Sequence, residues 1–334
     1  MDKVIQAIQK YQNFMVTTHC NPEGDALGSS LALALFLKQL GKNAKVVIHD
    51  PIPYFLEFLP EKHLVFQSPA IHSTFDVICV CDCGDIARTG YFKNPAPGEK
   101  IKYPAAEVIN IDHHVTNTRF GTINWIEGEA SASGEMVYDL IHAMKGTITQ
   151  AIATAIYTTV ITETGSFHYS NTTPKMFKIA SECAEKGIDV NLIARGIFDT
   201  SSKGRLTLLA KVLNSLEVSQ DGKIATVSVS GEMFKQTETT AEDTENFVSY
   251  PRSIKGVEVA ILFRENSPKE YKVSLRAQKE LDVSEVAGSF GGGGHKKAAG
   301  CTIQGNLSEV KQKVLQAIER SLSVHKEPDA RPQL

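Results

Sequence analysis

The chain has 334 residues, of which 42% are hydrophobic and 22% charged, a composition that excludes a disordered or fibrous protein. At ~150 residues per domain this length predicts two domains, each able to bury a core without disulfides. A net charge of −3 excludes a broadly basic coat for nucleic acid but leaves room for a local basic groove.

We expect neither a secretory signal at the N-terminus nor a membrane-spanning segment in the apolar runs. Residues 1–16 have the pattern of an amphipathic helix without the apolar core of a secretory signal. The most apolar run, residues 151–161, is shorter than the ~18 residues that span a bilayer. The six cysteines lack the CxxC spacing of a zinc knuckle, so we interpret them as reduced thiols in the cytoplasm. Three of them alternate along one apolar run and are expected on one face of a strand, opposite Asp82: Cys79, Cys81 and Cys83.

Strand-like and helical runs alternate in the first part of the chain. The β-rich runs are residues 14–18, 44–49, 76–82 and 106–112. The clearest helix between them spans residues 26–40 and stops at Gly41. This alternation predicts a parallel sheet with helices on both faces.

Consecutive helices follow, and a second mixed segment begins after Gly222. The helical runs are residues 134–145, 149–163, 174–187, 189–198 and 203–216, the third of them opening on a proline. The later segment predicts strands at 223–229, 257–263, 271–277 and 299–304, with the second and third forming a hairpin. Helices are expected at residues 282–290 and 307–322.

We therefore expect an α/β protein with two domains. The N-terminal parallel-sheet domain covers residues 1–190, and a helical connector covers 191–218. A smaller α/β domain for substrate binding covers 219–325, and residues 326–334 form a frayed tail.

Polar side chains gather directly after three of the predicted strands. In an open parallel sheet, ligands bind outside the carboxyl ends of the strands, so these residues are expected close together. They are His19, Glu23 and Asp25 after the first run, Asp82 and Asp85 after the third, and Asp112, His113 and His114 after the fourth.

Each of these residues alone has a structural explanation. Asp25 can be the N-cap of the next helix, Asp82 and Asp85 can be turn residues, and a lone His19 is more often structural. Together, however, their like charges cost several kcal/mol unless cations neutralise them. Carboxylates with a minority of imidazoles suit Mn²⁺ or Mg²⁺, and two such ions sharing one carboxylate hydrolyse phosphoesters.

The motifs resemble those of the DHH phosphoesterase superfamily, and within it the short nanoRNases and 3′,5′-bisphosphate nucleotidases. Five motifs occur in the family's order across nearly the whole chain. They are His19-x3-Glu23-x-Asp25-x2-Gly28-Ser29, Asp82-Cys-Gly-Asp85, Asp112-His113-His114, Thr162–Phe167 and Gly291–Gly300, the last similar to the signature of the DHH-associated C-terminal domain.

The resemblance implies two divalent cations, Mn²⁺ or alternatively Mg²⁺, that share Asp82. The implied ligands are His19, Glu23 and Asp82 for one ion and Asp25, Asp82, His113 and Glu163 for the other. The resemblance further implies that His114 stabilises charge on the scissile phosphate and that Asp112 orients a histidine.

The chain departs from the family's commonest pattern at two ligand positions. Glu23 and Glu163 stand where the family usually has aspartate, which moves each carboxylate by about one bond. A non-catalytic binding protein therefore stays open as a competing class.

The second domain is expected to bind the substrate's phosphate. Residues 250–300 carry nine Lys or Arg against six Asp or Glu, an excess of three positive charges. The glycine run can be a flexible loop, but glycines also allow backbone N–H groups to cradle a phosphate. Arg276 is either a solvated surface residue or a bidentate phosphate ligand. The expected substrate-binding residues are Arg276, Gly292, Gly293, Gly294 and His295.

The sequence thus predicts a metal-dependent phosphodiesterase that cuts short RNA or DNA oligonucleotides, such as pApA or pGpG, to nucleoside monophosphates. A 3′-phosphoadenosine 5′-phosphate phosphatase activity and a homodimer stay open. The SRKxQ-like motif of the superfamily's pyrophosphatases is absent. A soluble cyclic-dinucleotide phosphodiesterase is the alternative enzyme, and no membrane partner is expected.

Overall fold

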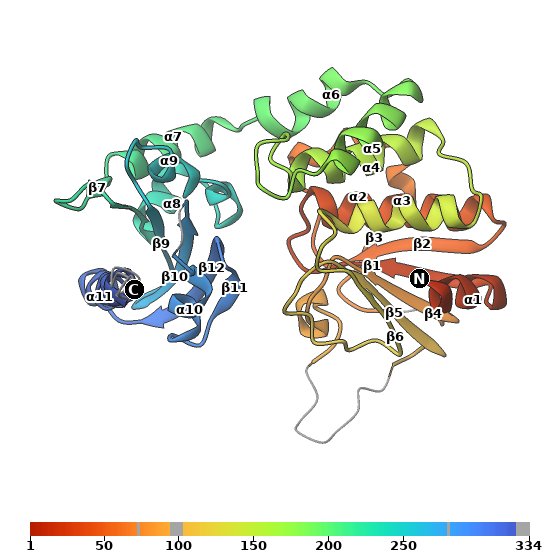
Figure 1. Ribbon diagram of the computed structural model, residues 1–334, viewed down its shortest axis with the longest axis horizontal. Coiled ribbons are helices and arrows are strands. Elements are labelled where there is room, and N and C mark those ends of the chain that lie inside the picture. The colour runs from red at the N-terminus through yellow and green to blue at the C-terminus, as the bar shows by residue number, and fades with distance from the viewer. Residues whose placement is uncertain (72–73, 94–102, 279–280, 325–334) are drawn as a thin grey trace, which may run out of the picture. The chain divides into compact units, whose positions relative to one another are not determined.

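The computed structural model describes residues 1–71, 74–93, 103–278 and 281–324 (Figure 1). The chain divides into two compact units, Met1–Thr200 and Ser201–Leu334. The expected tail at 326–334 lies outside the described residues. Among those that are described, no helix combines the length and apolar character needed to span a bilayer.

The first unit contains a parallel sheet in the order β3-β2-β1-β4-β5-β6. Its strands are β1 (Asn13–Thr17), β2 (Asn43–Ile48), β3 (Val65–Gln67), β4 (Val77–Cys81), β5 (Glu107–Asp112) and β6 (Ile123–Ile126). The four predicted runs correspond to β1, β2, β4 and β5, whereas the short β3 and β6 were not predicted. Strand order reverses between β1 and β4, so their carboxyl ends form the switch point at which open α/β sheets bind ligands.

The α-helices of this unit share one hydrophobic core with one face of the sheet. They are α1 (Asp2–Lys10), α2 (Gly24–Gln39), α3 (Ser133–Ala143), α4 (Gln150–Glu163), α5 (Pro174–Glu185) and α6 (Val190–Ala194). Each contributes buried side chains to one cluster, together with Phe14 and Val16 of β1. Helices α2 to α6 lie together on that side of the sheet (Figure 1). On the opposite face, Met15 and Val80 pack against a 3₁₀ helix, η3 (Ile86–Thr89), and loop residues. Helices on both faces were therefore a wrong prediction for the described residues, because the described part of the β4–β5 connection contains only η3.

The cysteines of β4 also differ from expectation. Cys79 and Cys81 lie in the helix-covered cluster, but Cys83 packs on the other face with Val80. Asp82 has a left-handed backbone (φ 53°), which ends the strand and interrupts the alternation of side chains. All six cysteines are free, and Cys20 alone is not buried.

The second unit is built on a mixed sheet in the order β11-β12-β10-β9-β8-β7. Its strands are β7 (Glu217–Val218), β8 (Ile224–Val229), β9 (Val259–Ser267), β10 (Glu270–Ala277), β11 (Gly293–His295) and β12 (Ala298–Gln304). The β8–β9 pair is parallel and the others are antiparallel, so the predicted β9–β10 hairpin is confirmed.

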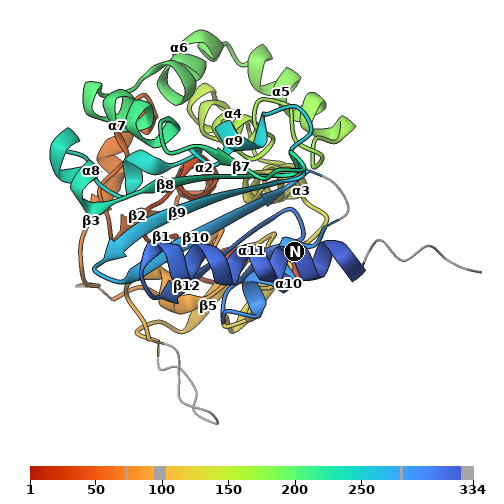
Figure 2. The same ribbon diagram turned by 90° about the vertical axis from the view of Figure 1, so that its left-hand side faces the viewer.

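Helices pack against both faces of this second sheet (Figure 2). They are α7 (Lys203–Leu213), α8 (Gly231–Thr237), α9 (Ser249–Arg252), α10 (Val283–Gly288) and α11 (Leu307–Val324). Val286 of α10 and Val314 of α11 pack with Val273 of β10 on one face. Leu208 and Val212 of α7 pack with β8 and β9 on the other. The short α8, α9, β7 and β11 were not predicted.

Candidate metal centre

The predicted site residues converge at the carboxyl ends of β1, β4 and β5. His19 follows β1, Asp82 follows β4, and His113 follows β5. Because β4 lies between β1 and β5 in the sheet, Asp82 stands between the other two groups. Two sets of three residues each have their possible ligand atoms within 4.8 Å of one another. One set is His19, Glu23 and Asp82, and the other is Asp82, His113 and His114.

Asp82 belongs to both sets because its two carboxylate oxygens face different histidines. Oδ2 lies 3.8 Å from Nε2 of His19, and Oδ1 lies 3.4 Å from Nε2 of His113. Oδ1 also accepts a hydrogen bond from the Ser133 hydroxyl at 3.2 Å. The left-handed backbone of Asp82 is sterically costly for a residue with a Cβ, and such strain clusters at functional sites. One side chain thus presents an oxygen to each half of the centre.

Backbone carbonyls hold the two imidazoles that face Asp82. Nδ1 of His19 lies 2.8 Å from the carbonyl of Cys20, and Nδ1 of His113 lies 3.2 Å from the carbonyl of Ala130. A carbonyl can only accept, so each Nδ1 carries the proton. Each Nε2 then points at the carboxylates, the orientation that metal-binding histidines adopt.

Glu23 and Asp25 approach the same histidines from the start of α2. Glu23 lies 3.1 Å from Nε2 of His19, so its longer side chain reaches this imidazole. Asp25 is fully buried, and its Oδ2 lies 3.7 Å from Nε2 of His113. Asp25 does not cap α2, which begins one residue earlier; its oxygens accept from Ser133 and Gly134 N–H groups at 2.7 and 2.9 Å. It therefore caps α3 instead of its own helix.

Glu163 is the last residue of α4. A Cβ at Gly28 of α2 would lie 2.7 Å from the backbone oxygen of Ala155, so only glycine lets the two helices approach so closely. This contact positions α4 beside the helix that carries Asp25. Glu163 is half-buried and lies outside the two compact ligand sets, although the charge of Asp82 acts on it.

The carboxylates near Asp82 are electrostatically unequal. Burial and the charge of Asp82 raise the pKa of Asp25 well above its usual range and that of Glu163 to about 7. Burial opposes ionisation of Asp82 as well, but hydrogen bonds with His113 and His19 hold its pKa well below the usual range. Mutual repulsion among carboxylates is the cost that a bound cation relieves.

The imidazoles supply positive charge to the same space. Although burial opposes protonation, Glu23 and Asp82 raise the pKa of His19 to about 11. Asp82 and Asp25 likewise raise the pKa of His113 to about 10. Protons thus provide the positive charge that these carboxylates require. A divalent cation fits in their place, since oxygen ligands with a minority of imidazoles match Mn²⁺ or Mg²⁺.

His114 is held from behind by a chain of hydrogen-bonded polar side chains. Its Nδ1 lies 2.7 Å from Oδ1 of Asp112, which is fully buried. Oδ2 of Asp112 accepts from Nδ2 of Asn117 at 2.5 Å, and Nδ2 of Asn110 donates to the side-chain Oδ1 of Asn117 at 3.0 Å. Asp112 raises the pKa of His114 against the opposing effect of burial. The ring is therefore fixed in orientation while its side chain stays one-quarter exposed.

Two residues of this arrangement escaped the sequence analysis. Ser133 binds Asp25 and Asp82, and its signal was the Ser-Gly pair that opens α3. Asn117 lies three residues after the Asp-His-His run, and no general sequence rule predicts from this spacing that it contacts Asp112. Asp85 has the structural role that was its alternative interpretation, that of a turn residue. It accepts from the N–H of Ala87 at 2.8 Å and caps η3.

In the second unit, the predicted substrate residues occupy neighbouring strands. Arg276 of β10 pairs with Ala298 of β12, which pairs with His295 of β11. Directly paired residues point to the same face, so Arg276 and His295 share one face of the sheet. α7 covers β8 and β9 on this face, whereas Arg276 and Gly300 are only half-buried.

The glycine run forms strand β11 and is not an unstructured loop. A Cβ at Gly292 would lie 2.2 Å from the oxygen of Gly300, and one at Gly294 would lie 2.5 Å from that of Ala298. Gly293 faces open space. Gly292 and Gly294 therefore allow β11 to approach β12, and Gly293 leaves its backbone accessible.

Comparisons with known proteins cover both units. A model of the DHH family N-terminal domain matches residues 13–160, and a model of the DHHA1 domain matches residues 221–323. A "Bifunctional oligoribonuclease and PAP phosphatase NrnA" from Thermus thermophilus is 33% identical over 311 residues, 92% of this chain and 90% of that protein. Its namesake from Bacillus subtilis is 24% identical over 90% of this chain and 92% of its own.

One solved structure is similar to this chain over nearly its full length. An exopolyphosphatase-related protein from Bacteroides fragilis superposes with a TM-score of 0.84 at 29% identity. The match covers 98% of this chain and 97% of that one.

Proposed function

Because the chain belongs to the DHH family of phosphoesterases and carries a C-terminal DHHA1 domain, we propose that it hydrolyses short oligoribonucleotides to nucleoside monophosphates. We propose 3′-phosphoadenosine 5′-phosphate as a second substrate, since the relatives from Thermus thermophilus and Bacillus subtilis are named for both activities. The observation that carries this proposal is the pair of Asp82 oxygens, each facing a different histidine.

The proposed ligands divide into two groups that share Asp82. His19 and Glu23 complete one group, and the other consists of Asp25, His113 and Glu163. When bound, two divalent cations polarise a phosphoryl oxygen and lower the pKa of water. We propose Mn²⁺, with Mg²⁺ as the alternative, because carboxylate oxygens with a minority of imidazoles suit both ions.

His114 is proposed to contact the substrate directly. Its Nδ1 is engaged by Asp112, so Nε2 is the nitrogen that can donate to a phosphoryl oxygen. A protonated imidazole in this position stabilises the negative charge that develops during hydrolysis. Asp112 supports that role by keeping the proton on Nδ1 and by favouring the cationic ring.

The sheet face that carries Arg276 in the second unit is proposed to bind a phosphate of the substrate. A guanidinium donates in a fork that matches phosphate oxygens. The accessible backbone at Gly293 and the side chain of His295 lie on neighbouring strands. We therefore assign recognition of the substrate's remote phosphate to this face and hydrolysis to the first unit.

Turnover of four substrates by one preparation tests the proposal. With Mn²⁺ present, pApA and 3′-phosphoadenosine 5′-phosphate should be hydrolysed, whereas a cyclic dinucleotide and a twenty-residue RNA should react much more slowly. The Asp82→Asn variant should be inactive on all four. Tight binding of pApA without hydrolysis would instead identify a nucleotide-binding protein. Preferential hydrolysis of the cyclic dinucleotide would replace the proposed substrate class.

A further inference from the structure

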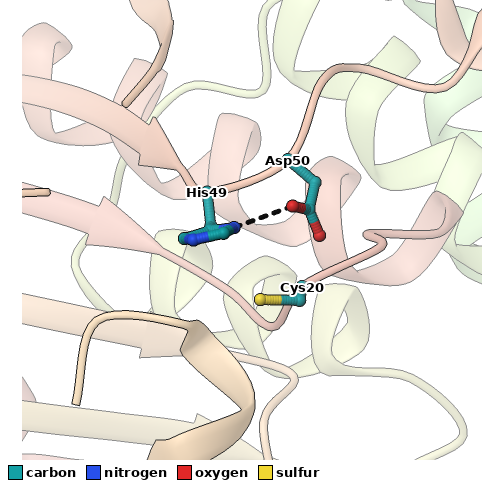
Figure 3. Close-up of side chains that lie close together, drawn as sticks. All are labelled: Cys20, His49 and Asp50. Carbon is teal, nitrogen blue, oxygen red and sulfur yellow. Dashed lines mark hydrogen bonds and ion pairs between the residues drawn. The ribbon is translucent and has the colours of Figure 1, made fainter. Parts of the chain in front are cut away.

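A second group of side chains with possible metal-ligand atoms lies at the carboxyl end of β1, beside the candidate centre. Cys20 follows β1, and His49 and Asp50 follow β2 (Figure 3). In the sheet, β2 and β4 flank β1 on opposite sides. This group therefore lies at the carboxyl ends of β1 and β2, and the candidate centre lies at the carboxyl ends of β1, β4 and β5. The possible ligand atoms of the three residues lie within 4.8 Å of one another.

The carboxylate of this group is held in place by its neighbours. Oδ1 of Asp50 lies 2.7 Å from Nδ1 of His49 (Figure 3). The N–H of Asn21 donates to Oδ2 of Asp50 at 2.7 Å. The Cys20 sulfur lies within 4.8 Å of the possible ligand atoms of both His49 and Asp50. The Asn21 backbone and the His49 imidazole thus hold the Asp50 carboxylate close to this sulfur.

The residue after η3, Gly90, packs tightly against His49 and Cys20. Gly90 has a left-handed backbone (φ 78°), and a Cβ there would lie 2.6 Å from His49 and 2.8 Å from the Cys20 sulfur. The N–H of Cys20 donates to the Arg88 carbonyl at 2.6 Å. The side chains of His49 and Asp50 are 33% and 25% exposed, so an ion from solvent can reach them.

The donor chemistry differs from that of the candidate centre. Sulfur with imidazole and one carboxylate oxygen is a borderline-soft set, which favours Zn²⁺ over Mn²⁺ or Mg²⁺. In a tetrahedral zinc site the ligand atoms are about 3.3–3.6 Å apart, so small side-chain movements bring the three together. We propose that Cys20, His49 and Asp50 bind one zinc-class cation at a site separate from the acidic centre. The thiol and imidazole protons leave to solvent when the metal bonds form.

Occupancy of this site would act on the candidate centre through a single residue. The side chain of Cys20 belongs to the proposed zinc site, while its carbonyl holds Nδ1 of His19. A cation that pulls the Cys20 sulfur toward Asp50 therefore shifts the carbonyl that orients His19. We expect zinc to slow hydrolysis by enzyme already saturated with Mn²⁺, a consequence that rests on the proposed function.

Spectroscopic titration with Co²⁺ tests the site without any activity measurement. The full-length protein is first saturated with Mg²⁺, which has no visible absorption band and is intended to fill the candidate centre. One equivalent of Co²⁺ should then give a sulfur-to-cobalt charge-transfer band, because Cys20 is the only cysteine that is not buried. The band should disappear in Cys20→Ser and appear only at about tenfold higher Co²⁺ or more in His49→Gln. It should persist in Asp82→Asn.

Matched controls separate the site from general effects. Cys301→Ser and His63→Gln replace the same residue types elsewhere, at a buried and an exposed position, and should keep the band. Melting curves report whether each variant folds. A wild-type protein without the band, or an unchanged band in folded Cys20→Ser or His49→Gln, overturns the proposed site. If the band behaves as expected but Zn²⁺ inhibits wild type and His49→Gln equally, the coupling to His19 is overturned.

Discussion

Replacing Asp112 by asparagine tests how the chain positions His114. The carboxylate accepts from His114 at 2.7 Å and from Asn117 at 2.5 Å, one bond to each oxygen. Asparagine offers only one acceptor oxygen, and the amide of Asn117 requires it. The new NH₂ group then faces Nδ1 of His114, which must give up its proton to accept a hydrogen bond.

The expected loss follows from one buried charge-assisted hydrogen bond. Such a bond contributes about 1.5–3 kcal/mol, which corresponds to about a tenfold to hundredfold lower kcat. Within the described ranges, the Asp112 carboxylate hydrogen-bonds His114 and Asn117, neither of which is a proposed metal ligand, so bound Mn²⁺ should stay at the wild-type level. Steady-state hydrolysis of pApA and metal analysis of the same preparation measure the two quantities.

A double-mutant cycle with His114→Ala decides whether Asp112 acts through His114. If it does, adding Asp112→Asn to His114→Ala should change kcat by less than about twofold, since coupled residues are not additive. A further tenfold loss in that background would refute the positioning role. Circular dichroism confirms that each variant keeps its fold, because Asp112 is fully buried.

Three other predictions concern separate parts of the chain. Glu23→Asp and Glu163→Asp should keep activity while Glu→Gln at either position impairs metal binding; normal binding by both Gln variants would remove them from the ligand set. Arg276→Ala should lower kcat/KM for pApA about tenfold to hundredfold and affect a phosphomonoester reporter much less, because one charged phosphate contact is lost. Asp76 accepts from the Gln12 and Asn13 N–H groups at 3.1 and 2.8 Å, and these bonds lower its pKa. A depressed folded-state pKa stabilises the protein above the unfolded value of about 3.9, and the stabilisation is lost as pH falls through the folded value. The melting temperature of Asp76→Asn should therefore lie below wild type at pH 7 and converge with it under acid conditions, and a constant difference would refute the assignment.

Much of the sheet could be predicted from the sequence because its strands are continuous apolar runs. β4, for example, is buried at all five positions, and the polar residues that follow it mark the strand's end. The same reasoning failed for Cys83, because the left-handed backbone at Asp82 depends on the surrounding site and not on local preference. β11 was also missed, since a strand of glycine and histidine carries no hydrophobic period.

The convergence of candidate ligands could be predicted from strand ends alone, but their supporting contacts could not. Asp25 caps α3, more than a hundred residues along the chain, and no local pattern links the two. Asn117 is fixed by partners on β5 and on the segment after β4. His49 and Asp50 also follow a strand, yet the sequence analysis left them out because they belong to no motif.

Anomalous diffraction from crystals grown with Mn²⁺ tests whether two metal ions share Asp82. We expect two manganese peaks about 3.5–4 Å apart, both bonded to Asp82, with His19 on one and His113 on the other. A single peak, or two peaks that do not share Asp82, would contradict the proposed two-metal centre.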